Sequence, residues 1–400
     1  MRHPINRSKE YLFFSKGNER ERLISFIFFL VAMGCLLPIF LPHQFSISPH
    51  AGYHKIFKII LLSLPILTLW ICSTIKLDLS MKQKIRLFIL FIGLAFLLND
   101  IHYTWVDITD NVFKTISNHQ FQVDLHEKVL NLSPEMIPHS YRFLPNSLAR
   151  IFEVLTGDFS YARALYRYIF MFLLLFSIYF YSRLYGNHEK SLWVVLLYSV
   201  VYPISIRYYA GQLTDPLSHF LFVCSFIFIQ LDLFLFFSLT ILLGIITKET
   251  ILIMPIYYIL LKIRDRACMV KGAILFMIGL SVVFFIRTVV NSNLDNSFTY
   301  KSISGVDFTH IRENLFENQS IWVPQVLFTV GIMMPFYVLS WKSSRKELRN
   351  LVLFLLPILF ISSTVFSWLY EARNFIPVFV PMAIIAANDW GGEGRNSHMK

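Results

Sequence analysis

The sequence predicts an all-α membrane protein: a polytopic bundle of about twelve transmembrane helices, with an external loop of short amphipathic helices after the third span. Composition is the first observation behind this fold class. Of the 400 residues 56% are apolar and 15% are charged, mean hydropathy is +0.57, and 40 residues are Phe. A water-soluble domain of this size cannot hide so many apolar side chains in one core, so the surplus must face lipid.

The length of the apolar runs is the second observation. A bilayer core about 30 Å thick needs roughly 20 mostly apolar residues per helix. The runs that approach this length lie at 23–41, 56–75, 85–105, 165–185, 192–206, 216–231, 233–247, 251–261, 272–290, 322–341, 351–369 and 374–388. The pair 233–247 and 251–261 is too short for two upright spans, so we expect it to be tilted, broken or partly re-entrant.

The placement of basic residues is the third observation. Of the 36 Lys and Arg residues, 22 fall in the two tails and in the short loops on one side of the predicted spans. Cytoplasmic flanks carry such an excess, so both termini should be cytoplasmic and the loops 106–164 and 291–321 should face the periplasm or a lumen. We expect a multi-pass protein of the bacterial inner (plasma) membrane. The net charge of +11 then reports orientation, and we expect no nucleic-acid partner.

The domain organisation follows from the same pattern. No internal repeat, low-complexity tract or linker divides the chain, which predicts a single membrane domain over 1–400. The loop 106–164 is its main insertion, and 291–321 forms a second external loop. Apolar residues such as Leu144, Leu148 and Ile151 recur in the first loop at helical spacing, as in helices that lie on a membrane surface.

Several functional classes lack their motifs in this chain. No HExxH, GxSxG, Walker lysine loop or GxGxxG occurs, and the four cysteines have no CxxC or zinc-ligand spacing. The sequence therefore indicates neither a nucleotide-driven enzyme nor a zinc or disulfide protein.

Ionisable residues near the predicted span ends fall on the external side. They are Asp100, Asp107, Asp110, Tyr141, Arg142, Asp215, Lys248, Glu249, Glu371 and Arg373. Charges at membrane depth cost several kcal/mol unless paired or wetted, so such residues tend to mark a water-filled functional cavity. The competing interpretation is structural: solvated loop carboxylates, local ion pairs and an arginine that snorkels to headgroups. This structural interpretation predicts that ionisable residues near span ends are spread over both sides of the membrane.

Four short segments carry a resemblance to a known family. They are 107–113 (DITDNVF), 141–145 (YRFLP), 244–250 (GIITKET) and 371–377 (EARNFIP). In their order and common side, the chain resembles the GT-C superfamily of integral membrane glycosyltransferases. These enzymes take a sugar from a polyprenyl-phosphate carrier on the non-cytoplasmic face. The chain differs from the usual arrangement by two extra spans before the acidic loop.

The resemblance implies transfer of a sugar from a polyprenyl-phosphate donor to a lipid-linked, glycan or protein acceptor. A carboxylate would act as general base and cations would hold the departing phosphate. Asp110 is the expected base, with Asp107 second. Arg142, Lys248 and Arg373 would contact the phosphate.

The remaining residues of this predicted site would serve the substrate. Glu249 and Glu371 would orient the cations or bind sugar hydroxyls, and Tyr141 and Asp215 would line the binding site. No cofactor is implied with certainty, although the loop aspartates offer carboxylate oxygens of the kind that bind Mg²⁺ or Mn²⁺.

Two alternatives stay open at this point. A polysaccharide polymerase or ligase acting on lipid-linked glycans would share the external loop and the basic residues. A transporter or flippase would place polar residues along a path through the bilayer, or show matching interrupted helices in two halves, and neither pattern is visible in the sequence.

Overall fold

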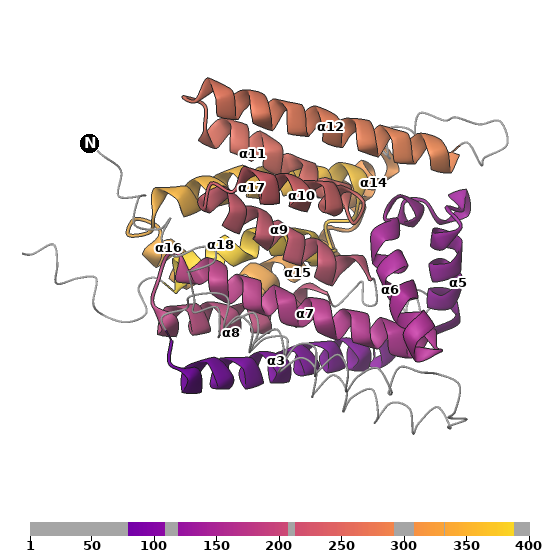
Figure 1. The fold of residues 1–400 in the computed structure, drawn as a ribbon, viewed down its shortest axis with the longest axis horizontal. Helices are drawn as coiled ribbons and strands as arrows, with labels where there is room; N and C mark the ends of the chain where they lie inside the picture. Colours follow the sequence, from indigo (N-terminus) through magenta and orange to yellow (C-terminus); the bar gives the residue numbers. More distant parts are fainter. Residues whose placement is uncertain (1–78, 109–118, 207–212, 292–307, 332, 388–400) are drawn as a thin grey trace, which may run out of the picture.

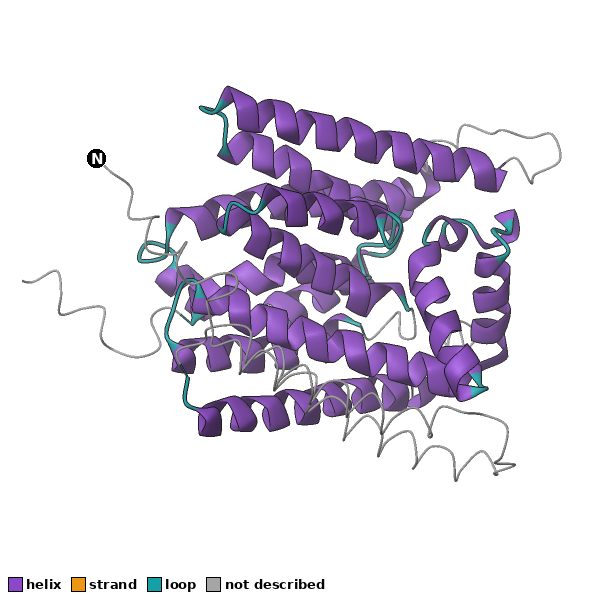
Figure 2. Cartoon of the chain, viewed as in Figure 1, coloured by secondary structure: helices purple, strands orange, loops and turns teal. Residues whose placement is uncertain are grey.

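The described part of the chain is entirely helical. The computed structural model describes residues 79–108, 119–206, 213–291, 308–331 and 333–387. Within these ranges there are 14 α-helices and no strand (Figure 2). The α-helices are α3 (Met81–Ile108), α5 (His119–Leu130), α6 (Phe143–Thr156), α7 (Phe159–Arg183), α8 (His188–Ser205), α9 (Thr214–Gln230), α10 (Phe234–Ile245), α11 (Ile253–Leu261), α12 (Arg266–Asn291), α14 (Phe308–Arg312), α15 (Gln319–Gly331), α16 (Met334–Ser340), α17 (Lys346–Phe366) and α18 (Ile376–Ala386).

Five short helical turns lie between them. Four are 3₁₀ turns and one is a π-helical turn: η4 (Pro134–Met136), η5 (His139–Tyr141), η6 (Glu249–Leu252), η7 (Glu313–Glu317, the π-helical one) and η8 (Ala372–Phe375). The predicted spans 23–41 and 56–75 lie outside the described residues.

The long helices run side by side as a bundle, and α5 and α6 stand across one end of it (Figure 1). α7 lies at the centre, packed against α3, α6, α8 and α9, while α12 packs on α11 at the edge. Burial distinguishes the central helix from the edge helix: 72% of the residues in the apolar 18-residue segment of α7 are buried, but only 17% of those in the corresponding segment of α12. α7, α12 and α17 are long and apolar enough to cross a membrane, which supports the predicted membrane protein.

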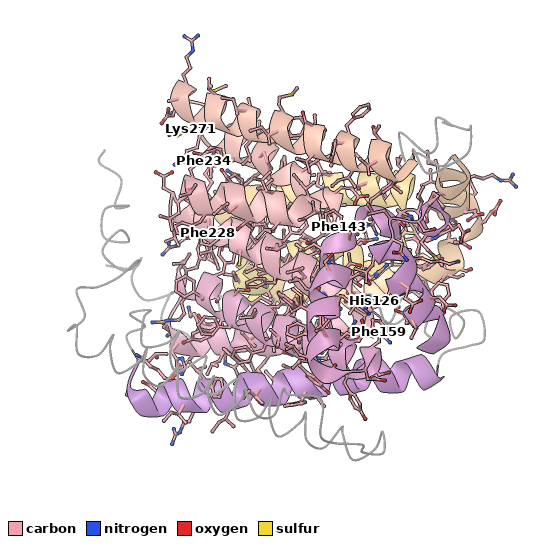
Figure 3. All side chains as sticks on the ribbon, turned by 45° about the vertical axis from the view of Figure 1, so that its right-hand side comes forward. His126, Phe143, Phe159, Phe228, Phe234 and Lys271 are labelled. Atoms are coloured by element: carbon pink, nitrogen blue, oxygen red, sulfur yellow. The ribbon has the colours of Figure 1, made fainter. Side chains whose placement is uncertain are left out.

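From α7 to α12, successive helices alternate in direction, so their ends fall into two sets (Figure 1). We call the end that carries α5, α6, the start of α9 and the end of α12 the α5/α6 end. The opposite end carries the start of α8, the start of α12 and the start of α17. Figure 3 shows the same separation, with His126 and Phe159 away from Phe228, Phe234 and Lys271.

The junction between α6 and α7 shows how the sequence directs the chain from the external loop into the bundle. Gly157 ends α6 in the left-handed conformation (φ +76°), and its N–H donates to the Glu153 carbonyl at 2.7 Å. Asp158 then caps α7, because its carboxylate accepts from the N–H groups of Ser160 and Tyr161 at 2.7 and 3.2 Å. Both residue types are the preferred ones for these positions.

Several predicted spans have different bounds in the structure, and two of them show why. The run 322–341 is divided into α15 and α16, because Pro335 lies in the first turn of α16, where its missing N–H is tolerated. The run 165–185 begins earlier, at Phe159, since the Asp158 cap precedes the apolar stretch. The pair 233–261 is short and broken as expected, with η6 between α10 and α11.

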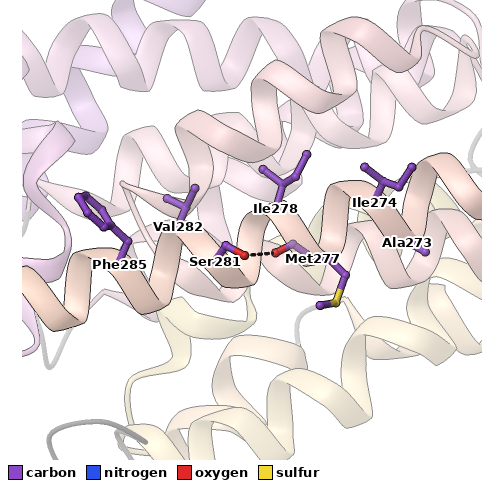
Figure 4. A pocket seen from close by; sticks show the side chains of 7 residues that line it. All are labelled: Ala273, Ile274, Met277, Ile278, Ser281, Val282 and Phe285. Carbon is purple, nitrogen blue, oxygen red and sulfur yellow. Dashed lines mark hydrogen bonds between the residues drawn. The ribbon is translucent and has the colours of Figure 1, made fainter.

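The outer face of α12 presents apolar side chains. Met277, Phe284 and Phe285 are 59%, 64% and 67% exposed. A shallow hollow of about 570 Å³ lies on this face, and Ser281, the polar residue in it, donates its hydroxyl to the Met277 carbonyl at 2.9 Å (Figure 4). Because this hydroxyl is bonded back to its own helix, the face presents apolar groups almost throughout.

Candidate functional site

Four buried charged residues and one half-buried amide from three segments meet at the α5/α6 end. We call them the inner cluster: Asp215, Lys248, Glu371, Arg373 and Asn374. The Arg373 guanidinium lies 2.5 Å from one Asp215 oxygen and 3.0 Å from Glu371 Oε2. Lys248 Nζ donates to Asn374 Oδ1 at 2.8 Å and lies 3.8 Å from Asp215 Oδ1. The four charged members are at most 8% exposed.

An outer cluster lies beside it, made of Tyr141, Arg142, Glu249 and Arg287. Arg142 donates two hydrogen bonds of 3.2 Å to the Glu249 carboxylate, one from Nε and one from a terminal nitrogen. Arg287, from the end of α12, lies 3.7 Å from Glu249 Oε1, and its guanidinium carbon is 5.3 Å from the centre of the Tyr141 ring. Lys248 and Glu249 are consecutive, so they join the two clusters.

A close approach of two segments places Lys248 and Glu249. At Gly244, near the end of α10, an added Cβ would lie 2.4 Å from Ile251 Cδ1 and 3.3 Å from Ile251 Cβ. The Gly244 carbonyl accepts from the Lys248 N–H at 2.7 Å, which closes the turn. Glycine at 244 therefore lets η6 fold back onto α10 and turns both charged side chains toward the α5/α6 end.

A buried amide supports the Glu371 segment. Asn314 is fully buried; its amide nitrogen donates to the Thr364 and Ser367 carbonyls at 3.1 and 2.8 Å, and its oxygen accepts from the Leu369 N–H at 2.9 Å. These are the free carbonyls at the end of α17 and the first amide of the following loop. Ser367 in turn donates its hydroxyl to Glu371 at 3.1 Å.

The charges of the described residues in the two clusters do not cancel. Arg142, Arg287, Lys248 and Arg373 face three carboxylates, those of Asp215, Glu249 and Glu371. The inner cluster is closed to solvent, while Arg142, Arg287 and Glu249 keep 16%, 17% and 24% of their side-chain surface exposed. An incoming anion would therefore meet the arginines of the outer cluster first.

One acceptor in the inner cluster is unsatisfied. Asp215 Oδ1 is buried and has no hydrogen-bond partner among the described residues, and Lys248 Nζ, at 3.8 Å, is too far for a good bond. Buried carboxylate oxygens are normally bonded, so this atom calls for an added donor such as a hydroxyl.

A cavity of about 20 Å³ next to Arg142 joins the clusters to the external helices. It is lined by Gln122 of α5, His139 of η5, Asn146 of α6, Phe159 and Thr214, besides other residues. His126 stacks on Phe159 with ring centroids 4.4 Å apart and reaches Asn146 and Glu153 at 3.0 and 3.3 Å, so it holds α5 on α6. Burial, and then the charges of Arg142 and Arg373, lower the pKa of His139 to about 3, so its imidazole stays neutral.

Seven of the predicted site residues are brought together in the two clusters: Tyr141, Arg142, Asp215, Lys248, Glu249, Glu371 and Arg373. The predicted bases are not placed. Asp110 lies outside the described residues, and Asp107 belongs to the last turn of α3, where only the backbone is described, as it is for Asp100. Within the described residues no three His, Cys, Asp or Glu side chains group as metal ligands.

Sequence reasoning missed Arg287 and Asn374 as members of the clusters, and His139 as a neighbour. It also passed over Arg163 and Arg167, which are 7% and 1% exposed on α7. These two arginines are four residues apart in an otherwise apolar span, so they lie on one face of the helix, and this spacing could have pointed to them.

Comparison with known proteins adds no relative to this geometry. No family model matches the chain, and no curated protein or solved structure matches it either.

Proposed function

We propose that this protein is a membrane glycosyltransferase that moves a sugar from a polyprenyl-phosphate donor to a glycan, lipid-linked or protein acceptor. One observation carries the proposal: charged residues from distant segments converge at one end of a helical bundle, and among the described residues of the two clusters four cations face three carboxylates. An excess of cations in such a cluster favours an anionic ligand.

The outer cluster suits the phosphate of the donor. Arg142 and Arg287 share one carboxylate, Glu249. A phosphate can therefore accept hydrogen bonds from both guanidiniums while both keep their contact with Glu249. Stabilising charge that builds on the departing phosphate is the main task in this chemistry. The apolar outer face of α12, which ends at Arg287, would carry the prenyl chain in lipid.

The inner cluster suits the hydroxyl groups of the sugar. Asp215 Oδ1 is free to accept a hydrogen bond, while Arg373 and Lys248 keep the Asp215 carboxylate charged. Asp110 remains our candidate for the general base and Asp107 the second, because Asp107 lies in the last turn of α3, which ends at the α5/α6 end, and Asp110 comes three residues later in the sequence. We propose that this end faces the periplasm and that both chain termini are cytoplasmic.

The test is a transfer assay with the purified protein in lipid, a radiolabelled polyprenyl-phosphate monosaccharide and cell-envelope acceptor glycans. We expect Arg142→Gln and Arg287→Gln to lower transfer roughly 10–100-fold, the value of a charge-assisted hydrogen bond. Asp110→Asn should abolish it if Asp110 is the base. Arg150→Gln is the matched control, since Arg150 lies in the same loop but is 54% exposed and pairs with Glu153.

Two outcomes would contradict the proposal. Activity only with a lipid-linked oligosaccharide would favour a polymerase or ligase. If both arginine variants are folded and membrane-inserted and transfer sugar at the wild-type rate, the outer cluster does not bind the donor.

A further inference from the structure

A second basic hollow lies at the end of the bundle opposite the two clusters. It is a cavity of about 180 Å³ between the end of α7, the start of α8 and the start of α17. Lys190 and Arg345 supply its cations, and Ser182, Tyr185 and Ser343 supply side-chain hydroxyl groups. We call it the α8/α17 pocket.

The electrostatics of the α8/α17 pocket favour an anion. None of the described residues that line it is acidic; Glu189 and Glu347 lie in the first turns of α8 and α17 but are exposed and outside the lining. Both helices begin here, so their N-terminal dipoles add positive potential. The start of α17 has no side-chain cap, whereas α8 is capped by Asn187 at 3.0 Å.

Arg345 is held in place by its neighbours. The Arg345 guanidinium carbon lies 5.4 Å from the centre of the Tyr185 ring, and the Tyr185 hydroxyl donates to Gln230 Oε1 at 3.2 Å. Arg345 therefore stacks on a ring that is itself fixed, which leaves its fork of N–H groups available in one orientation.

The size and the remaining lining select the kind of anion. At roughly 30 Å³ per water, 180 Å³ holds the equivalent of about six waters, enough for a phosphate ester but below the 300 Å³ or more typical of whole drug-sized ligands. Val194, Leu348 and Ile384 make the rest of the wall apolar. A phosphate ester whose apolar chains stay in the bilayer fits a pocket with one polar and one apolar wall.

We propose that the α8/α17 pocket binds the phosphate of an anionic phospholipid headgroup at the membrane surface opposite the two clusters. Basic pockets between transmembrane helices on the cytoplasmic side are suited to such headgroups. This surface carries the basic loops 262–271 and 342–349, so it is also the side that we expect to face the more anionic leaflet. The proposal does not depend on the glycosyltransferase assignment.

The experiment is native mass spectrometry of the full chain, purified in detergent and incubated with phosphatidylglycerol, phosphatidylcholine or inorganic phosphate. We expect one retained phosphatidylglycerol per chain, and little phosphatidylcholine. The double variant Lys190→Gln, Arg345→Gln should bind phosphatidylglycerol with about 30-fold lower affinity, which corresponds to about 2 kcal/mol for two cations. Arg264→Gln, Arg266→Gln removes two exposed charges outside the lining and should change nothing.

Three results would overturn the proposal. Equal loss in both double variants would mean that the surface charge alone attracts lipid. Equal retention of phosphatidylcholine would mean that the phosphate charge is not recognised. Saturable binding of inorganic phosphate without phosphatidylglycerol would assign the pocket to a free ion in place of a lipid.

Discussion

Arg373 holds two carboxylates at once, so its replacement tests the inner cluster at the scale of one residue. Arg373→Gln leaves Asp215 and Glu371 buried without their guanidinium, and removal of one partner from a buried ion pair costs about 3–5 kcal/mol. We expect a clearly lower midpoint of thermal unfolding in detergent. Asp215→Asn combined with Arg373→Gln should lose less than the sum of the two single variants, because it removes a charge together with its partner. Additive losses would show that the two side chains do not interact.

His139 gives the outer edge of the site a predictable response to acid. The folded pKa is about 3 and the ordinary value is 6.5, so between these pH values the unfolded chain binds a proton that the folded chain does not. Stability contributed by the neutral imidazole is therefore present above pH 6.5 and is lost as pH falls toward 3. We expect the unfolding midpoint of His139→Gln to fall less steeply than that of the wild type between pH 7 and pH 4. Identical slopes would mean that the folded chain does not hold His139 neutral.

Gly244 tests the turn between α10 and η6 at the scale of an element. Gly244→Ala forces a Cβ against Ile251, a buried β-branched side chain with little rotamer freedom, and overpacking of this kind costs about 1–3 kcal/mol. Because Lys248 and Glu249 follow this turn, transfer activity should fall with stability. Gly93→Ala in α3 is the matched control, since an added Cβ there meets open space. Equal midpoints for the two variants would contradict the close approach.

Asn314 tests the link between η7 and the segment that carries Glu371 and Arg373. Asn314→Ala leaves buried carbonyls at the end of α17 and the Leu369 N–H without a partner, which costs about 1–3 kcal/mol for each unsatisfied group. We expect proteolysis to cut 363–371 faster in the variant. Gln319→Ala is the control, because the Gln319 amide bonds only to the carbonyl of its own turn and is exposed. Unchanged cleavage would assign support of this loop to other contacts.

At the same scale, the apolar runs predicted the helices well and their ends poorly. Apolar length located α7, α12 and α17, but the start of α7 is decided by the Asp158 cap and the division of 322–341 by Pro335. Caps and breaks are local hydrogen-bond chemistry, which a hydropathy pattern does not contain. The external loop 106–164 was predicted as amphipathic helices, and α5 and α6 lie there, with η4 and η5 between them.

For the whole molecule, sidedness predicted most of the two clusters and could not reveal their pairings. Charged residues next to span ends pointed to Asp215, Lys248 and Arg373, since alternating helices bring every second end to one face. Arg287 was passed over because its partners, Glu249 and Tyr141, are distant in sequence and meet it only through packing of α12 on the η5 and η6 segments. Asn374 was missed because an uncharged amide has no weight in a charge pattern.

The orientation of the bundle is the prediction on which the placement of both clusters and of the α8/α17 pocket depends. In a background without cysteines, we expect Glu135→Cys to react with a membrane-impermeant maleimide in intact cells, because Glu135 is exposed on η4 at the α5/α6 end. Arg264→Cys, exposed between α11 and α12 at the opposite end, should react only after permeabilisation. A helix that crosses the bilayer separates its ends by about 30 Å of hydrocarbon, so both sites cannot lie on one side if α12 spans. Labelling of both from outside would remove α12 as a span, and the reverse pattern would place the ion-pair clusters on the cytoplasmic face, where a periplasmic sugar donor could not reach them.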